Sequence, residues 1–239
     1  MSAPMLGDFL EISVSTAEIL ASIEFYERLG FRHAPVGETW RHPYAVLTDG
    51  RVALGLHQYE FPSPSLTFVL PDLRAKLAGF EQLGIEFAFC KLADDEFNEA
   101  GFTDPDQQMI TLLEARTYSP LRAGFGDSAC GYFLEYRIGV RDCKSSCDFW
   151  ERMGMVAAVV NEPPAHYAQV ARSGLNLGMQ VRGARTPPQL VFINEQPEVL
   201  LQLLETRGIP FRRQRDHDGA SAIQIATPDG LELVIRDRD

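Results

Sequence analysis

Two glutamates in matching settings are the residues of this chain whose type and position most favour chemistry. Residues 9–11 read Phe-Leu-Glu, residues 133–135 read Phe-Leu-Glu again, and each tripeptide lies in a run where apolar and polar residues alternate. Such alternation predicts a strand with one buried face, and Glu11 and Glu135 both fall on the polar face. A carboxylate there could anchor a small organic ligand or coordinate a hard divalent metal.

Further polar and aromatic residues fall on or beside the same predicted faces. His57 would suit a general base near neutral pH, although a lone histidine on a strand also serves as a structural or solvent-facing residue. Glu135 and Arg137 lie two apart on one strand face, so a mutual ion pair is an alternative to ligand binding. Trp40 and Tyr44 could form flat walls of a small-molecule site.

The repeat of the glutamate motif extends along the whole chain. Residues 25–28 (Phe-Tyr-Glu-Arg) return as residues 149–152 (Phe-Trp-Glu-Arg) at an offset of 124 (149 − 25), and Pro-Asp at 105–106 returns at 228–229. A near-constant offset indicates one module duplicated and fused. We expect modules at residues 1–115 and 132–239, each of ordinary domain size, joined by a linker with Pro and Gly at 116–131.

Periodicity predicts the same elements in both modules. In the first, strands are expected at 10–16, 44–48, 52–57, 66–70, 87–90, 99–102 and 109–113, with helices at 17–29 and 73–83. In the second, strands are expected at 134–140, 167–171, 175–181, 190–194, 222–226 and 232–235, with helices at 143–153 and 199–206. Counted by halves, each module contains two βαβββ units, which makes an internally duplicated α+β fold.

Composition excludes several classes of function. The 239 residues are 45% hydrophobic with a formal net charge of −11, and such an acidic chain is a poor partner for nucleic acid. The balance favours neutral or cationic ligands. No apolar run approaches the roughly 20 residues of a membrane span. The four cysteines form no Cys-x-x-Cys pair, so we expect reduced thiols in a cytoplasmic protein.

These motifs resemble the vicinal oxygen chelate superfamily, which includes glyoxalase I, extradiol dioxygenases and bleomycin-binding proteins. The cues are Ser-Ile-Glu-Phe-Tyr at 22–26, Leu-Gly-Phe at 29–31, and Asp-Pro-Asp at 104–106, with related versions in the second module. The resemblance covers nearly the whole chain. It implies tandem βαβββ units whose mixed sheets curl into U-shaped clefts. In members that use metal, the concave face supplies up to four ligands.

The metal-ligand set that the resemblance implies is incomplete in this sequence. Glu11 and Glu135 occupy the first ligand position, and the remaining positions fall on Gly55 and Gly178, Ser65 and Gln189, and Thr111 and Val234. A transition metal needs about three good donors, so we expect no metal. The alternative is a divalent metal that uses Glu11 or Glu135.

Strand parity then predicts two clefts, each combining residues of both modules. One would bring Glu11 and His57 together with Gln189 and Glu232. The other would bring Glu135, Arg137 and Gln180 together with the hydroxyls of residues 65, 67 and 111.

The favoured interpretation is a metal-free small-molecule-binding protein, similar to the bleomycin-resistance branch, that sequesters or senses a drug or metabolite. A metal-dependent lyase, isomerase or dioxygenase similar to glyoxalase I is the first alternative. An interaction protein with a vestigial cleft is the second. The expected partner is a small molecule, with neither nucleic acid nor membrane, and the chain could be a monomer or a homodimer.

Overall fold

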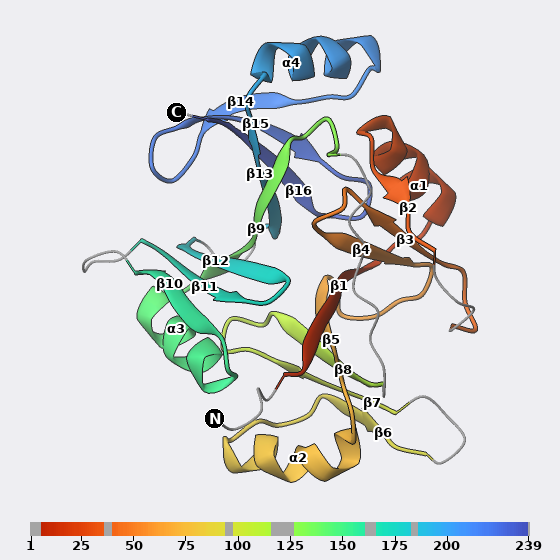
Figure 1. The fold of residues 1–239 in the computed structure, drawn as a ribbon, viewed down its shortest axis with the longest axis vertical. Helices are drawn as coiled ribbons and strands as arrows, with labels where there is room; N and C mark the ends of the chain where they lie inside the picture. Colours follow the sequence, from red (N-terminus) through yellow and green to blue (C-terminus); the bar gives the residue numbers. More distant parts are fainter. Residues whose placement is uncertain are drawn as a thin grey trace.

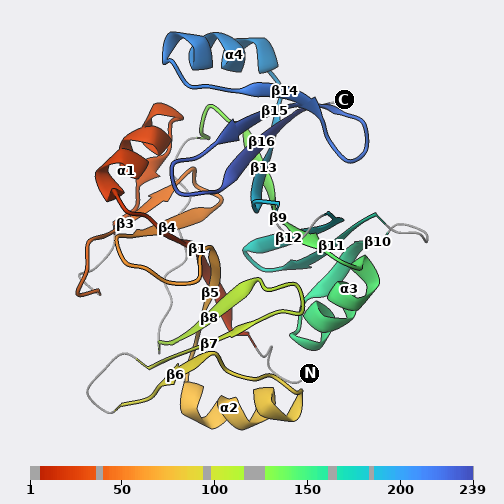
Figure 2. The ribbon, with the colours of Figure 1, turned by 180° about the vertical axis from the view of Figure 1, so that it is seen from behind.

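The computed structural model describes residues 6–35, 40–93, 98–115, 127–160, 166–182 and 186–238. In these residues the chain forms two eight-stranded mixed sheets, and each sheet carries two ten-residue helices on one face (Figures 1 and 2). The sequence therefore predicted the fold class, a duplicated α+β arrangement, correctly. Part of the proposed linker, residues 116–126, lies outside the described residues.

The first sheet has the strand order β2-β3-β4-β1-β5-β8-β7-β6. Its elements are β1 (Asp8–Ser15), α1 (Ile19–Arg28), β2 (Arg32–His33), β3 (Tyr44–Thr48), β4 (Ala53–His57), β5 (Ser65–Leu70), α2 (Leu73–Gln82), β6 (Phe89–Lys91), β7 (Glu99–Thr103) and β8 (Met109–Glu114). Helix α1 ends before Gly30, whose φ of 91° lies in the left-handed region that a helix C-terminus commonly requires.

The second sheet repeats this order as β10-β11-β12-β9-β13-β16-β15-β14. Its elements are β9 (Tyr132–Val140), α3 (Cys143–Arg152), β10 (Val156–Val160), β11 (Tyr167–Arg172), β12 (Leu175–Val181), β13 (Gln189–Asn194), α4 (Pro197–Thr206), β14 (Arg212–Arg215), β15 (Ser221–Ala226) and β16 (Glu232–Asp237). Asp142 caps α3, since its carboxylate accepts the backbone N–H of Ser145 at 2.8 Å.

The Phe-Leu-Glu motif lies at a β-bulge in both modules. The pairing of β1 with β5 shifts register between Phe9 and Glu11, and β9 shifts equivalently against β13. The bulge turns Phe9 into the core, where its ring lies 5.5 Å from that of Phe68, while Leu10 is only half-buried. Simple alternation would place Leu10 on the same apolar face as Ile12, but alternation does not anticipate the extra residue of a bulge.

The two βαβββ units of one module pair with each other. β1 runs antiparallel to β5, with Ile12 opposite Leu66, and β9 runs antiparallel to β13, with Tyr136 opposite Leu190. Each concave face therefore consists of strands from a single module. The predicted clefts that mix the two modules are not formed.

The modules dock through a reciprocal contact between helix and turn. Tyr26 of α1 donates a hydrogen bond to Asp229, in the turn before β16, at 3.1 Å. Ser146 of α3 donates to Asp106, in the turn before β8, at 2.6 Å. Accordingly α1 with β2–β4 lies beside β13–β16, and α3 with β10–β12 lies beside β5–β8 (Figures 1 and 2). The repeated Pro-Asp motifs thus hold the two modules together.

Across the described part of the chain, no helix is long and apolar enough to cross a membrane.

Asp104, which begins the turn before β8, should make the free energy of unfolding depend on pH. Its buried carboxylate accepts the backbone N–H groups of Asp106 and Gln108, both at 2.8 Å, yet burial raises its pKa to about 7. The folded state therefore binds a proton more tightly than the unfolded state, and this group destabilises the fold progressively as pH rises from about 4 to about 7.

We expect Asp104→Asn, which keeps the acceptor and removes the charge, to raise the melting temperature at pH 8 by several degrees more than at pH 4.5. Thermal unfolding at both pH values checks this difference. An equal change at the two pH values would contradict it.

Candidate functional site

Glu11 lies at the base of the first concave face, where its carboxylate is only 3% exposed. Ser13 donates to Oε1 at 2.8 Å and Tyr44 donates to Oε2 at 2.6 Å. Nε2 of His57 lies 3.3 Å from Oε1. Burial, together with the adjacent Glu11, raises the pKa of Tyr44, so this phenol stays a hydrogen-bond donor at all working pH values.

A glycine on the neighbouring strand makes room for this carboxylate. Gly55 on β4 pairs with Ser13, and a Cβ built on Gly55 would lie 1.9 Å from Oε1 of Glu11. Gly178 on β12 does the same for Glu135, with 2.4 Å to Oε2. Gly55 and Gly178 occupy a position at which metal-binding members carry a ligand. Here the lack of a side chain leaves the space that the glutamate carboxylate occupies.

Two histidines continue the polar chain from Glu11 toward the open side of the sheet. Nδ1 of His57 lies 2.9 Å from Nε2 of His42, and the His42 ring stacks on Tyr59 with ring centroids 5.1 Å apart. Burial lowers the pKa of His42, His57 lowers it further, and Glu99 opposes these effects. Sequence reasoning missed His42, because it precedes Pro43 and looked like a loop residue.

The first concave face contains a cavity of about 630 Å³. Hydroxyls of β1, β5 and β8 form its floor, aromatic rings form its walls, and two lysine or arginine side chains with two glutamates lie at its edges. These lining residues include Ser13, Thr67, Thr111, Trp40, His42, His57, Tyr59, Phe61, Phe89, Arg41, Lys91, Glu60 and Glu99. Flat apolar walls with a few polar groups are typical of small-molecule sites.

The equivalent glutamate of the second module is held differently. Glu135 is fully buried and accepts from Tyr167 at 2.5 Å, from Gln169 at 2.7 Å and from Nε of Arg137 at 2.7 Å. Arg137 stands where the first module has Ser13 (137 − 13 = 124). The ion pair between Glu135 and Arg137, which the sequence left as an alternative to ligand binding, is therefore present.

Arg137 joins a second carboxylate above Glu135. Its guanidinium donates two parallel hydrogen bonds to Asp216, at 2.6 and 3.0 Å. Burial opposes ionisation of Asp216, but hydrogen bonds from His217 and Arg137 outweigh it and lower the pKa. Burial lowers the pKa of Arg137, but the neighbouring carboxylates of Glu135 and Asp216 raise it by more, so the pKa lies above its usual value. This buried charge network lies at the base of the second concave face, where the first has only the hydroxyl of Ser13 beside its glutamate.

Among the described residues, the side chains around Glu11 do not bring three histidine, cysteine, aspartate or glutamate ligand atoms together on one point. Both Glu11 oxygens already accept hydrogen bonds, Nε2 of His57 faces Oε1 of Glu11 while His42 lies on the far side of His57, and the remaining strand positions contribute Gly55 and hydroxyls, which are weak ligands. In the second cleft the guanidinium of Arg137 lies within 2.7 Å of both Glu135 and Asp216, where it would repel a metal ion.

Asp216, His217 and Asp218 place their ligand atoms close enough to hold a metal, but their arrangement serves another purpose. Asp216 is engaged by Arg137, and Asp218 by Arg236. The cluster is therefore the acidic side of a salt-bridge network. Sequence reasoning also missed Asp216, since it lies in the turn between β14 and β15, where alternation carries no information.

The predicted site residues separate by module. Glu11, His57, Trp40 and Tyr44 gather in the first cleft. The other five lie on the second concave face: Glu135, Arg137, Gln180, Gln189 and Glu232. Among them, Gln189 donates a hydrogen bond to Glu232 at 2.9 Å.

The prediction that Gln189 and Glu232 join Glu11 was therefore wrong, as was the placing of residues 65, 67 and 111 beside Glu135. Ser13 contacts Thr67 at 2.7 Å, and Ser65 contacts Thr111 at 2.7 Å, all within the first module.

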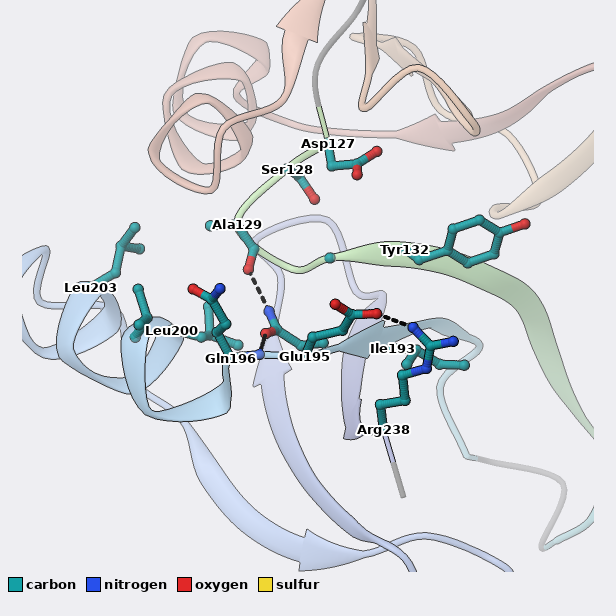
Figure 3. Close-up of a pocket in the computed structure, with 13 residues that line it drawn as sticks. Asp127, Ser128, Ala129, Tyr132, Ile193, Glu195, Gln196, Leu200, Leu203 and Arg238 are labelled. Carbon is teal, nitrogen blue, oxygen red and sulfur yellow. Dashed lines mark hydrogen bonds and ion pairs between the residues drawn. The ribbon is translucent and has the colours of Figure 1, made fainter.

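A second hollow, of about 750 Å³, lies between the segment 127–132 and helix α4 (Figure 3). Its wall includes Ser128, Tyr132 and Leu200, and an ion pair between Arg238 and Glu195 lies along one side. None of the nine predicted site residues is among the described residues that line it. The hollow is therefore no part of the candidate site.

Gly55→Ala tests the fit between the glycine and the carboxylate. Because the new methyl group would overlap Oε1 of Glu11, we expect destabilisation of about 1–3 kcal/mol, measured by urea unfolding. The same change in a Glu11→Ala background should cost almost nothing, since the overlap is gone. An equal cost in both backgrounds would disprove the steric explanation.

Arg137→Ala should destabilise the protein by about 3–5 kcal/mol, because it leaves two buried carboxylates without their cation. Urea unfolding measures the effect. The control is Lys144→Ala, which removes an exposed ion pair with Asp148 and should leave the midpoint nearly unchanged. If both variants unfold at the midpoint of the unmodified protein, the network is not structural.

Among known proteins, no family model and no curated protein matches the chain. Solved structures match it over nearly its whole length. Catechol 2,3-dioxygenase is 14% identical with a TM-score of 0.64, over 98% of this chain and 88% of that one.

Two homoprotocatechuate 2,3-dioxygenases give similar matches. A variant from Brevibacterium fuscum is 14% identical with a TM-score of 0.66, over 99% of this chain and 73% of that one. The enzyme from Arthrobacter globiformis is 14% identical with a TM-score of 0.65, over 99% and 81%. A further matching structure, also from B. fuscum, is of an extradiol ring-cleaving dioxygenase and has a TM-score of 0.66. This chain therefore has the same overall fold as these ring-cleaving dioxygenases, in agreement with the fold that the sequence resemblance implies.

Proposed function

We propose that the first-module cleft binds a small, flat organic molecule without a metal ion, and that the protein sequesters or senses such a drug or metabolite. One observation carries this proposal. The first concave face contains a cavity of about 630 Å³ that Ser13 helps to line, whereas at the position equivalent to Ser13 the second module has Arg137, held in a buried ion-pair network. On this proposal the first module holds the ligand and the second is a supporting scaffold.

The walls of the cavity support a flat ligand. The indole of Trp40 lies 5.3 Å from the ring of His57, and Phe61 meets the same imidazole edge-on at 5.5 Å. Rings arranged in this way offer both faces and edges to another aromatic group. The matching structures named for catechol and homoprotocatechuate act on small aromatic molecules, which supports the same class of ligand here.

The hydrogen-bonding groups at the base of the first cleft support binding without a metal ion. Glu11 anchors the floor through Ser13 and Tyr44, and Thr67 lies within hydrogen-bond distance of Ser13 at 2.7 Å. Thr67 and Thr111 are therefore placed to bond polar atoms of a ligand from below.

We propose further that modules at residues 1–115 and 132–239, joined at 116–131, work in the cytoplasm as a monomer or homodimer. All four cysteines are free thiols, as a reducing compartment favours.

Trp40 provides a direct test of binding. The chain has two tryptophans, and the other, Trp150, is fully buried in α3. We expect flat aromatic ligands to quench the fluorescence of Trp40 and to raise the melting temperature, because a ligand of the native state stabilises it. In Trp40→Phe the quenching should disappear while the thermal shift remains.

Two further variants, one in each hollow, serve as a matched pair for this test. Thr111→Phe should abolish both signals by filling the cavity, and Val199→Ala, at the hollow beside α4, should leave them intact. The proposal fails if a panel of neutral and cationic aromatic compounds produces neither signal in the unmodified protein.

Metal binding distinguishes this proposal from a metal-dependent enzyme. After incubation with Fe²⁺, Mn²⁺ or Zn²⁺ and gel filtration, we expect far less than one metal per chain by elemental analysis, and no loss of ligand binding on chelation. One tightly held metal per chain that Glu11→Gln or Glu135→Gln removes would overturn the metal-free proposal.

A further inference from the structure

A line of three ionisable side chains leads from the buried base of the first cleft to its open cavity. Glu11 accepts from Ser13 and lies 3.3 Å from Nε2 of His57, and Nδ1 of His57 lies 2.9 Å from Nε2 of His42. His57 is 5% exposed, and both imidazoles line the cavity. The distances join the three groups into one hydrogen-bonded chain.

One arrangement of the protons lets this hydrogen-bonded chain end in a base. When a neutral His57 directs its Nε2–H to the Glu11 carboxylate, its Nδ1 accepts the hydrogen bond that Nε2–H of His42 donates. His42 then keeps a lone pair on Nδ1, which is the form of imidazole that can remove a proton.

We propose that His42 is a general base that removes a proton from a flat aromatic carbon acid bound in the first cleft, with Glu11 and His57 as its positioning residues. This inference rests on the proposed binding function and adds a reaction to it. The reaction class is metal-independent proton transfer.

The surroundings of His42 favour this role. Tyr59 stacks on its ring and Trp40 lies 5.5 Å away, so an aromatic ligand can occupy the adjoining space. Burial and His57 lower the pKa of His42 and Glu99 raises it, which leaves the imidazole neutral near pH 7. Among the described residues, the charged groups that line this space are Arg41, Glu60, Lys91 and Glu99, with Lys91 paired to Glu99 at 2.6 Å.

The second module offers a natural comparison. His217 also stacks on a tyrosine, Tyr167, with ring centroids 4.2 Å apart, but it lies 3.3 Å from Asp216 inside the salt-bridge network. That imidazole lines neither of the two hollows described above. A histidine beside a tyrosine therefore occurs in both modules, and the histidine of the first module, His42, lines the cavity of about 630 Å³.

5-Nitrobenzisoxazole tests the base directly, because one proton transfer converts this flat molecule to a coloured product. Nδ1 of His42 would take the proton from C3, the C–H electron pair would complete a carbon–nitrogen triple bond, and the ring N–O bond would break to release a nitrophenolate. His42 would then return the proton to water. The reaction needs no oxidant and no metal.

We expect turnover by the unmodified protein and a loss of about 100-fold or more in His42→Gln, since general bases commonly contribute this much. The rate should fall as pH drops through a midpoint below that of an ordinary histidine. His57→Gln should move that midpoint as well as the rate, which a merely structural effect would not do. The control His217→Gln should retain the full rate.

Quenching of Trp40 by the same compound separates the two proposals. If the compound quenches Trp40 but its turnover is absent or does not depend on His42, the general-base role of His42 is refuted and the proposed binding function stands. Neither quenching nor turnover would overturn both. Equal rates in the unmodified protein and in His42→Gln would also refute the base, whatever the affinity.

Discussion

A carboxylate taken out of water must be matched by hydrogen-bond donors, and both halves of this molecule are arranged around that requirement. Glu11 and Glu135 each fold over a glycine on the adjacent strand and collect donors from neighbouring strands. The bulge in the Phe-Leu-Glu motif turns the phenylalanine inward as the chain approaches the glutamate. Bulge, glutamate and glycine therefore recur together as one unit at the same place in both sheets.

The clefts diverge at the residue two positions after each glutamate. Ser13 is short and neutral, so it satisfies Glu11 and leaves the space above it open. Arg137 is long and charged, so it satisfies Glu135 but requires a second carboxylate, which Asp216 supplies from a distant turn. The side chain at this position thus sets what surrounds each glutamate: a hydroxyl in the first module and a buried charge network in the second.

Most of the fold could be predicted from the sequence, because alternation, helical spacing and the repeat all indicate local structure. Strands that lack alternation were missed: Arg212–Arg215 reads as a solvated basic run, yet it is an edge strand. The individual strand residues of the site, such as His57 and Tyr44, follow from parity. Their grouping does not, since parity says which face a residue occupies but not which strands become neighbours. His42 and Asp216 lie in connections, where only three-dimensional packing brings them to the cleft.

The reciprocal docking of each Pro-Asp turn on the other module's first helix has a consequence for how this protein can change. Two identical chains assembled in the same way would carry every substitution twice, once in each cleft. Joined in one chain, the halves mutate separately while the helix–turn contacts keep both in place. Substitutions in one concave face can then accumulate independently of the other without loosening the contacts that hold the two modules together.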